Sequence, residues 1–376
     1  MSRNPVLTSA YAVEKVAEHV KLDLDGCDRA ARKLVQKLKV TPYTASDWAS
    51  VPLHPIPTSL PPVELLHWVF LVSTLNFSFW SKSDNSKRFG VKYKTGVDGK
   101  EAFDTDPTTG KRTVREQVFT GYFSLLAALH RARDEGVDVT NPRWYARASD
   151  EELRRVFRSD QDEEMPLLDE RIRVLRETGS ILCQRFGGSF ATLVDQAQYS
   201  ALKLVDLVVS TFPCYDDKSL YPASGPGPIF IRKRAQILIA ETWAAFQGQG
   251  LGRFDDIDEI TMFADYRVPQ ILHSLGTITY SPHLEEILKS HTMLKQGSPI
   301  EVEIRCLSIV AVEEIRRAIN SAFKGQHSGV EPHCSKQVIK APNAVLLDFL
   351  LWDLAKVEEA EGRAQLPHHC TRSVFY

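Results

Sequence analysis

The sequence predicts a mainly α-helical protein, and three observations support this fold class. Apolar residues recur with the 3.6-residue period of a helix in two long segments, Ser189–Val209 and Glu301–Ile319. Evidence for strands is thin, and no alternation of strands with helices indicates a parallel sheet. Because no internal repeat of solenoid length is present either, we expect one helical domain that spans residues 1–376.

Further helices follow from proline positions and apolar spacing. Proline costs nothing in the first turn of a helix, so Pro61–Pro62 opens a helix that continues towards Asn76. The same spacing predicts helices over residues 11–20, 116–135, 166–178, 231–246 and 344–357.

The remaining segments predict little regular structure. One short hairpin is expected between Phe89 and Lys100, where Val91 and Tyr93 alternate around a glycine-rich turn. Two polar stretches, residues 96–115 and 324–337, predict loop insertions at the surface.

Composition limits the class of protein. The chain has 43% hydrophobic and 25% charged residues, which is typical of a globular protein with a large core. Its 46 Lys and Arg residues nearly balance 48 Asp and Glu residues, so we expect no stable nucleic-acid complex. Six scattered cysteines predict reduced thiols. Without a signal-like N-terminus or an 18-residue apolar run, we expect a cytoplasmic protein, or a nuclear one, that makes no membrane contact.

The segment Thr261–Tyr280 carries the strongest candidate for chemistry, Asp265. This carboxylate lies between apolar residues and a polar cluster of Tyr266, Arg267 and Gln270. The proline at 269 is expected to end any helix that begins upstream, because the residue before a proline is pushed out of the α region. Asp265 then either points into a cavity or caps the next helix, and geometry alone favours the cap.

Two other segments place polar groups where a ligand would explain them. Lys233 and Arg234 open a predicted helix, and cations at a helix N-terminus are unfavourable unless they meet an anion. Asn76 would be a buried amide that needs partners and could bind the edge of a guanine-like base. Its aromatic neighbour Phe77 is either a core residue or part of a ligand platform.

The C-terminus concentrates binding chemistry, although most chain ends fray. His369 and Arg372 are candidates for binding a phosphate, because Arg offers a planar fork of donors. A zinc site at His368 and His369 is not expected, since adjacent histidines point apart and no third ligand is evident. We expect no metal and no cofactor.

Five segments together resemble the queuosine salvage protein family of queuosine 5′-phosphate N-glycosylase/hydrolases. The segments are LNFSFW (75–80), TGYFSLLAALHRA (120–132), RKRAQILIAETW (232–243), TMFADYRVPQ (261–270) and PHHCTRSVFY (367–376). The resemblance runs from about residue 5 to the last residue, with insertions near 95–115 and 322–340. It departs at Glu241, where relatives usually carry aspartate, and at Cys370, where they usually carry a basic residue.

The resemblance implies a hydrolase with a helical fold related to the DNA glycosylases. Its substrate would be queuosine 5′-monophosphate, a small nucleotide, and its product the base queuine for reinsertion into tRNA. Asp265 is the expected catalytic carboxylate, because one carboxylate can stabilise or attack the oxocarbenium-like sugar. Expected substrate-binding residues are Asn76, Phe77, Lys233, Tyr266, Arg267, Gln270, His369, Arg372 and Tyr376.

Some assignments stay open at this stage. Lys233 and Asn76 are candidates for assisting the leaving base, and Asp84 and Glu241 for pairing with the aminomethyl cation of queuine. A glycosylase that acts on polymeric nucleic acid would require a basic face, which the composition does not suggest. A non-catalytic helical interaction module would leave Asp265, Lys233 and Arg372 far apart.

Overall fold

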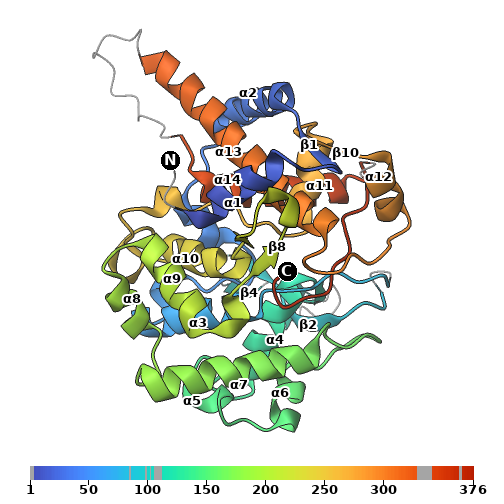
Figure 1. Ribbon diagram of the computed structural model, residues 1–376. Coiled ribbons are helices and arrows are strands. Elements are labelled where there is room, and N and C mark those ends of the chain that lie inside the picture. The colour runs from blue at the N-terminus through green and yellow to red at the C-terminus, as the bar shows by residue number, and fades with distance from the viewer. Residues whose placement is uncertain are drawn as a thin grey trace.

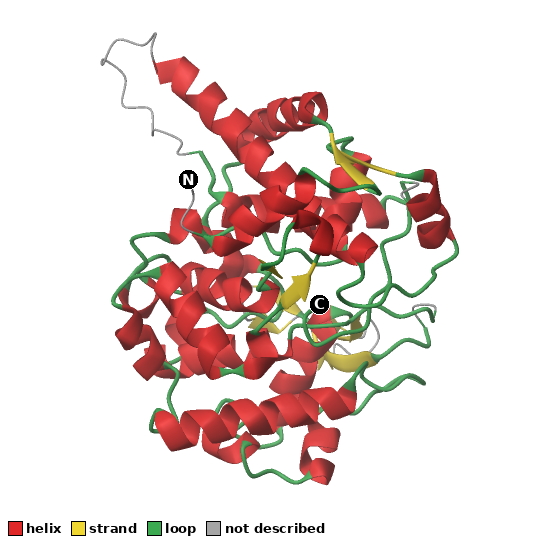
Figure 2. Cartoon of the chain, in the orientation of Figure 1, coloured by secondary structure: helices red, strands yellow, loops and turns green. Residues whose placement is uncertain are grey.

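The computed structural model describes residues 4–83, 86–97, 100–101, 103–105, 112–327, 341–363 and 366–376. Helices dominate this part of the chain (Figure 2), which confirms the mainly α-helical prediction. None of the described helices is both long and apolar enough to cross a membrane. The relation to the DNA-glycosylase fold stays a prediction.

One layer of helices packs around α13 (Pro299–His327), which contacts α1 (Pro5–Glu14) and α2 (Leu24–Val40). The other elements of this layer are α11 (Arg267–Ser274), α12 (Pro282–Lys289), α14 (Ala344–Ala360), and the antiparallel pair β1 (Val20–Leu22) and β10 (Ile278–Tyr280). In Figure 1 this layer lies at the top, and its apolar faces form one continuous core cluster.

The central layer contains two helices that are buried on nearly all sides, α3 (Pro62–Leu75) and α10 (Lys233–Ala245). In α3 the buried faces are almost entirely apolar, which is typical of an interior helix, whereas α10 also buries charged side chains. The other elements of this layer are α8 (Ala191–Ala197), α9 (Ala201–Thr211), β8 (Lys218–Leu220) with β9 (Pro228–Phe230), and the 3-10 turns η1 (Ala45–Ser50), η2 (Pro57–Ser59), η3 (Pro213–Tyr215), η4 (Pro222–Ser224), η5 (Gly250–Gly252) and η6 (Ile257–Glu259).

The layer at the bottom of Figure 1 packs under α3. It consists of α4 (Tyr122–Asp134), α5 (Pro142–Tyr145), α6 (Asp150–Val156), α7 (Leu168–Arg185) and the strands β2 (Gly90–Lys94) and β7 (Glu116–Thr120). The strands β3 (Gly96–Val97), β4 (Lys100–Glu101), β5 (Phe103–Thr105) and β6 (Arg112–Val114) fall in the predicted insertion 96–115, of which residues 98–99, 102 and 106–111 lie outside the described residues.

The predicted hairpin at 89–100 is only partly correct. Val91 and Tyr93 belong to β2, which pairs antiparallel with β7 rather than with the residues that follow it. The local turn joins only the two-residue strands β3 and β4. The predicted helix 116–135 is therefore also wrong in its first turn, because residues 116–120 form β7. Gly121, at φ 63°, separates that strand from α4.

Three other predicted helices have different bounds. The predicted helix 189–209 is two helices, because Gln198 and Tyr199 adopt left-handed φ values and Ser200 caps α9. The first helix begins at Pro5 rather than at residue 11, since Asn4 accepts a hydrogen bond from the Val6 amide at 3.0 Å. The helix predicted over 301–319 extends to residue 327, into the predicted loop 324–337; residues 328–340 lie outside the described residues.

A buried ion pair joins the central layer to α13. The Arg305 side chain is completely buried and donates two hydrogen bonds to Asp217, at 2.7 and 3.1 Å. It also lies 3.3 Å from Glu301, which accepts a hydrogen bond from the Tyr376 hydroxyl at 2.6 Å. The Asp217 carboxylate in turn accepts a hydrogen bond from the backbone amide of Lys233. The Asp217 carbonyl accepts hydrogen bonds from the amides of the two residues before Lys233. One buried cluster therefore fixes the start of α10 and the end of the chain.

We predict that Asp217→Asn lowers the free energy of unfolding by about 3 kcal/mol or more, because it removes the closer of the two carboxylates that pair with the buried Arg305 guanidinium. Urea denaturation measures this change. The matched control is Asp216→Asn, because that partly exposed neighbour pairs with the exposed Lys218 at the surface, where an ion pair contributes less than about 1 kcal/mol. Equal unfolding midpoints for the two variants would contradict the role of the buried pair.

Candidate active site

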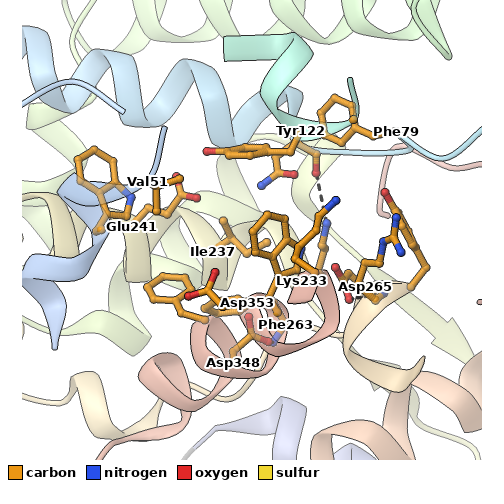
Figure 3. A pocket seen from close by; sticks show the side chains of 18 of the residues that line it. Val51, Phe79, Tyr122, Lys233, Ile237, Glu241, Phe263, Asp265, Asp348 and Asp353 are labelled. Atoms are coloured by element: carbon orange, nitrogen blue, oxygen red, sulfur yellow. Dashed lines mark hydrogen bonds between the residues drawn. The ribbon is translucent and has the colours of Figure 1, made fainter. Parts of the chain in front are cut away.

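A large cavity opens between α10, α14 and the loop that precedes α4. The empty space within it, including open solvent at its mouth, amounts to about 1040 Å³. Its walls are largely aromatic, and its polar groups come from α10, α14 and the segment before α11 (Figure 3). The aromatic lining residues are Tyr43, Trp48, Phe79, Tyr122, Phe263, Tyr266, Phe349, Trp352 and Tyr376.

Asp265 lines this cavity and also caps α11. Its Oδ1 accepts hydrogen bonds from the amides of Arg267 and Val268, both at 2.8 Å. Its Oδ2 accepts none from the described residues. Both readings of the sequence are therefore correct at once: one oxygen fixes the carboxylate, and the other is available to a ligand. Pro269 lies in the first turn of α11 and ends no upstream helix, contrary to the prediction.

Lys233 approaches the same region from the first turn of α10. The side chain is buried, and its Nζ donates to the carbonyl of Asn76 at 3.3 Å. Burial lowers the pKa of Lys233 to about 8, although the nearby charge of Asp265 opposes that shift. Burial likewise raises the pKa of Asp265, and the charge of Lys233 opposes it. The two groups therefore stabilise each other's charged forms.

Asn76 lines the cavity at the C-terminal end of α3, while Phe77 does not. Phe77 is completely buried between two guanidinium groups, with Arg171 4.2 Å and Arg234 5.0 Å from its ring centre. Both arginines donate to backbone carbonyls at the end of α3 rather than to carboxylates. Phe77 is therefore a core residue that helps to hold Asn76 in position. It is not part of a ligand platform, because it does not line the cavity.

Two further buried carboxyl groups line the cavity. Glu241 lies two turns after Lys233 on α10, and burial raises its pKa to about 8. Asp348 on α14 accepts a hydrogen bond from the Phe263 amide at 2.8 Å, and burial raises its pKa well above the usual range. Figure 3 shows Glu241 and Asp265 on opposite sides of the pocket, with Ile237 and Lys233 between them.

Positive side chains border the cavity near Tyr266. Arg267 and Lys356 both pair with Glu359, at 3.0 and 3.6 Å. Arg88 also lines the cavity close to this group. Arg267 and Lys356 carry two positive charges against the one carboxylate that they share, so this region is suited to an anionic group.

The C-terminal Tyr376 lines the cavity, as the sequence suggested. Its ring lies 4.5 Å from the Arg305 guanidinium, and its backbone carbonyl accepts a hydrogen bond from the Ser78 amide at 2.6 Å. His369 contacts the Tyr376 hydroxyl at 3.0 Å. The chain end is thus held by buried contacts, and this explains why it does not fray.

Three predicted binding residues contact protein groups instead of lining the main cavity. Gln270 donates to the carbonyl of Leu366 at 2.9 Å. Arg372 stacks 3.8 Å from the Trp80 ring and donates to the carbonyl of Ser78. His369 is buried behind Tyr376. The structure therefore does not bring these three side chains to the cavity wall, and their assignment to substrate stays a prediction.

Other lining residues escaped the sequence analysis. Trp48 and His54 lie in none of the segments that the sequence singled out, and Tyr122 lies in the segment 120–132 but was not named as a candidate. Asp348 did carry a signal, because it is an acidic residue in the middle of an apolar helical segment. Asp84, one suggested partner for a cationic ligand, lies outside the described residues.

No group of three or more potential metal ligands gathers in the described parts of the chain. His368 lies against Trp80 and Tyr266 rather than beside a carboxylate. His333 and Cys334 are outside the described residues. The expected absence of a metal stays a prediction that needs a direct test.

Comparison with known proteins shows the family to which this chain is related. Residues 54–376 match the family model described as queuosine salvage protein. A relative from Schizosaccharomyces pombe, named queuosine 5′-phosphate N-glycosylase/hydrolase, is 38% identical over 393 aligned residues that cover 100% of both chains. Relatives of the same name from Mus musculus and Sphaerobacter thermophilus are 40% and 35% identical, and each alignment covers at least 97% of both chains. This chain belongs to the queuosine salvage protein family.

Proposed function

We propose that this protein hydrolyses the N-glycosidic bond of queuosine 5′-monophosphate and releases queuine for salvage into tRNA. The observation that carries the proposal is the state of Asp265. One of its oxygens is fixed by two backbone amides, and the other accepts no hydrogen bond from the described residues, in an aromatic cavity beside Lys233. The name that the relatives from Schizosaccharomyces pombe and Mus musculus carry, queuosine 5′-phosphate N-glycosylase/hydrolase, supports the same reaction.

Asp265 would act on the sugar. When the bond between C1′ and the base nitrogen breaks, its electron pair leaves with the base and positive charge develops on the ribose. A carboxylate held in place needs no reorganisation to stabilise that charge. Water supplies the oxygen that bonds to C1′, and Asp265 is suited either to accept the water's proton or to form a transient bond to C1′ itself.

Lys233 and Asn76 would assist the leaving base. A 7-deazapurine lacks the ring nitrogen that purine hydrolases protonate, so negative charge on the departing base must be stabilised by other hydrogen bonds. Because the pKa of Lys233 is lowered to about 8, its ammonium group is a better proton donor near neutral pH than an exposed lysine. The side-chain amide of Asn76 lines the same wall.

The 5′-phosphate would lie beside Arg267 and Lys356, which line the cavity, rather than beside His369 and Arg372, which do not. The shared carboxylate of Glu359 neutralises only part of this positive charge. Arg is suited to this role because its guanidinium group can bind two phosphate oxygens at once.

Two other functions fit the structure less well. A base glycosylase that acts on polymers needs an extended basic surface, whereas the cations at this cavity form a local group next to a carboxylate. A non-catalytic module gives no reason for Asp265 and Lys233 to meet in one pocket, although Arg372 does lie outside it.

We expect Asp265→Asn to lower kcat on queuosine 5′-monophosphate about a thousandfold or more, because it removes the charge that faces the ribose. Release of queuine, followed by mass spectrometry, measures the rate. The amide oxygen can still accept the two backbone hydrogen bonds, so the melting temperature should change little. A variant that melts far lower but keeps its specific activity would show that Asp265 acts only as a cap.

We expect Arg267→Ala to reduce kcat/KM for the monophosphate about tenfold more than for unphosphorylated queuosine, since one charged hydrogen bond contributes about 1.5–3 kcal/mol. The matched comparison is Arg372→Ala, which should affect both substrates equally. If Arg372→Ala instead shows the phosphate-selective loss and Arg267→Ala does not, the phosphate lies at the C-terminal segment, as the sequence alone suggested.

We also predict full activity in excess EDTA and no stoichiometric metal in the purified protein. Ribosyl transfer to water needs no Lewis acid when a carboxylate and several donors surround the sugar, because the developing charge is positive. Turnover with and without chelator, together with elemental analysis, tests this. Activity that is lost in EDTA and restored by zinc or magnesium would overturn the mechanism based on a single aspartate.

A further inference from the structure

The wall of the cavity opposite Asp265 contains a chain of three aromatic groups with a fixed hydrogen-bond direction. His54 Nδ1 lies 2.9 Å from the carbonyl of Trp48, and a carbonyl can only accept, so Nδ1 carries the proton. His54 Nε2 is then an acceptor, and the Tyr122 hydroxyl 2.9 Å away donates to it. Burial lowers the pKa of His54 to about 3, so the ring is neutral and this arrangement persists at physiological pH.

Trp48 is held by the same chain but lacks one partner. Its indole packs against the His54 ring at 4.2 Å between ring centres, with the two planes tilted by 45°. Its Nε1–H is buried and finds no acceptor among the described residues. A buried donor without an acceptor costs free energy, and Trp48 lines the cavity. A ligand oxygen or nitrogen at this wall would remove that cost.

Glu241 is a buried carboxyl group that also lacks a strong partner. Its one hydrogen bond, from the Ser73 hydroxyl to Oε2, is long at 3.4 Å, and Oε1 accepts none from the described residues. The Tyr122 hydroxyl cannot serve it, because that hydrogen points to His54. The 3-10 turn η1, which carries Trp48, packs directly against α10, which carries Glu241. Two residues that line the cavity from neighbouring elements thus carry an unmatched donor and an unmatched acceptor.

We propose that Glu241 and Trp48 bind the guanine-like edge of the substrate base and so determine base specificity. Glu241 loses its proton when the base binds, and its two carboxylate oxygens then accept hydrogen bonds from the ring N1–H and the 2-amino group, while Trp48 Nε1 donates to the 6-oxo group. This inference rests on the proposed function, because it takes the base to be a 7-deazaguanine. It assigns the two residues to binding and not to the bond-breaking step.

The length of the pocket agrees with this assignment. Lys233, Ile237 and Glu241 succeed one another at four-residue intervals along one side of α10, so Glu241 lies about 12 Å along the helix axis from Lys233. A purine-sized base with a hydrogen bond at each end spans a similar length. Its glycosidic nitrogen would lie near Asp265 and Lys233, and its far edge near Glu241.

The aminomethyl cation of queuine fits this end of the cavity less well. An ammonium group would pair with Glu241, but it offers only donors, so the Trp48 N–H would still lack an acceptor. The guanine edge presents an acceptor beside two donors and satisfies both residues. Asp353, which lines the cavity on α14 and accepts a hydrogen bond from Tyr43 at 2.7 Å, is a second carboxylate that a cation could approach.

Calorimetric binding of free bases to the full chain tests the proposal without requiring turnover. The probes are queuine, 7-deazaguanine, which lacks the aminomethyl group, and 7-deazaadenine, whose edge has the opposite donor and acceptor pattern. Glu241→Gln should weaken both queuine and 7-deazaguanine about thirtyfold, since a mismatched buried hydrogen bond costs about 2 kcal/mol. Trp48→Phe should weaken the binding of queuine and of 7-deazaguanine about tenfold, while it keeps an aromatic ring packed against His54.

Asp353→Asn is the matched control, because it removes a different carboxylate from the same cavity and should leave 7-deazaguanine binding within about twofold. If Glu241→Gln weakens queuine alone, Glu241 binds the cation and the proposal is overturned. It is also overturned if wild-type protein binds 7-deazaadenine as tightly as 7-deazaguanine. A wild-type chain that binds no base and releases none from queuosine 5′-monophosphate refutes the proposed function itself.

Discussion

The ion pair between Arg305 and Asp217 is the contact on which the rest of the active site depends. Asp217 accepts the amide hydrogen bond that starts α10, and Arg305 lies under the ring of Tyr376. Positions 217, 233, 305 and 376 are therefore fixed relative to one another by one buried cluster, although they are far apart in the sequence. Burying such a pair is costly unless its hydrogen bonds are nearly all made, and here Arg305 also donates to the carbonyls of Ala264 and Phe375.

The sequence predicted the fold class and the central helices because apolar periodicity depends on local spacing alone. It failed where a non-local or backbone factor decides the structure. Residues 116–120 form a strand because they pair with β2 across an insertion, and no window of adjacent residues contains that information. The helix predicted over 189–209 breaks at two residues with left-handed φ. Neither of them is glycine, so the composition of the segment did not predict the break.

The candidate site was predictable where a polar residue interrupts an apolar segment. That signal identified Asp265, Lys233 and Asn76, which all line the cavity. The same signal also identified Gln270 and Arg372, whose partners are backbone carbonyls. A sequence shows that a buried polar group needs a partner, but it does not show whether that partner is a ligand or the protein. Trp48 was missed for a different reason, because its neighbours Asp47, Ala49 and Ser50 form no apolar segment or motif that would mark it as part of a site.

The C-terminal end of α3 explains why Lys233 keeps its positive charge and two of its donors for the cavity. Four consecutive carbonyls, at positions 74 to 77, are the negative end of the helix dipole, and each accepts a hydrogen bond from Arg234, Arg171 or Lys233. The two arginines use their donors on carbonyls and stay in the core. Among the described residues, Lys233 donates only one of its three N–H groups to a carbonyl, that of Asn76. Because a carbonyl holds the ammonium group without removing its charge, two donors remain for the base and the charge remains for Asp265.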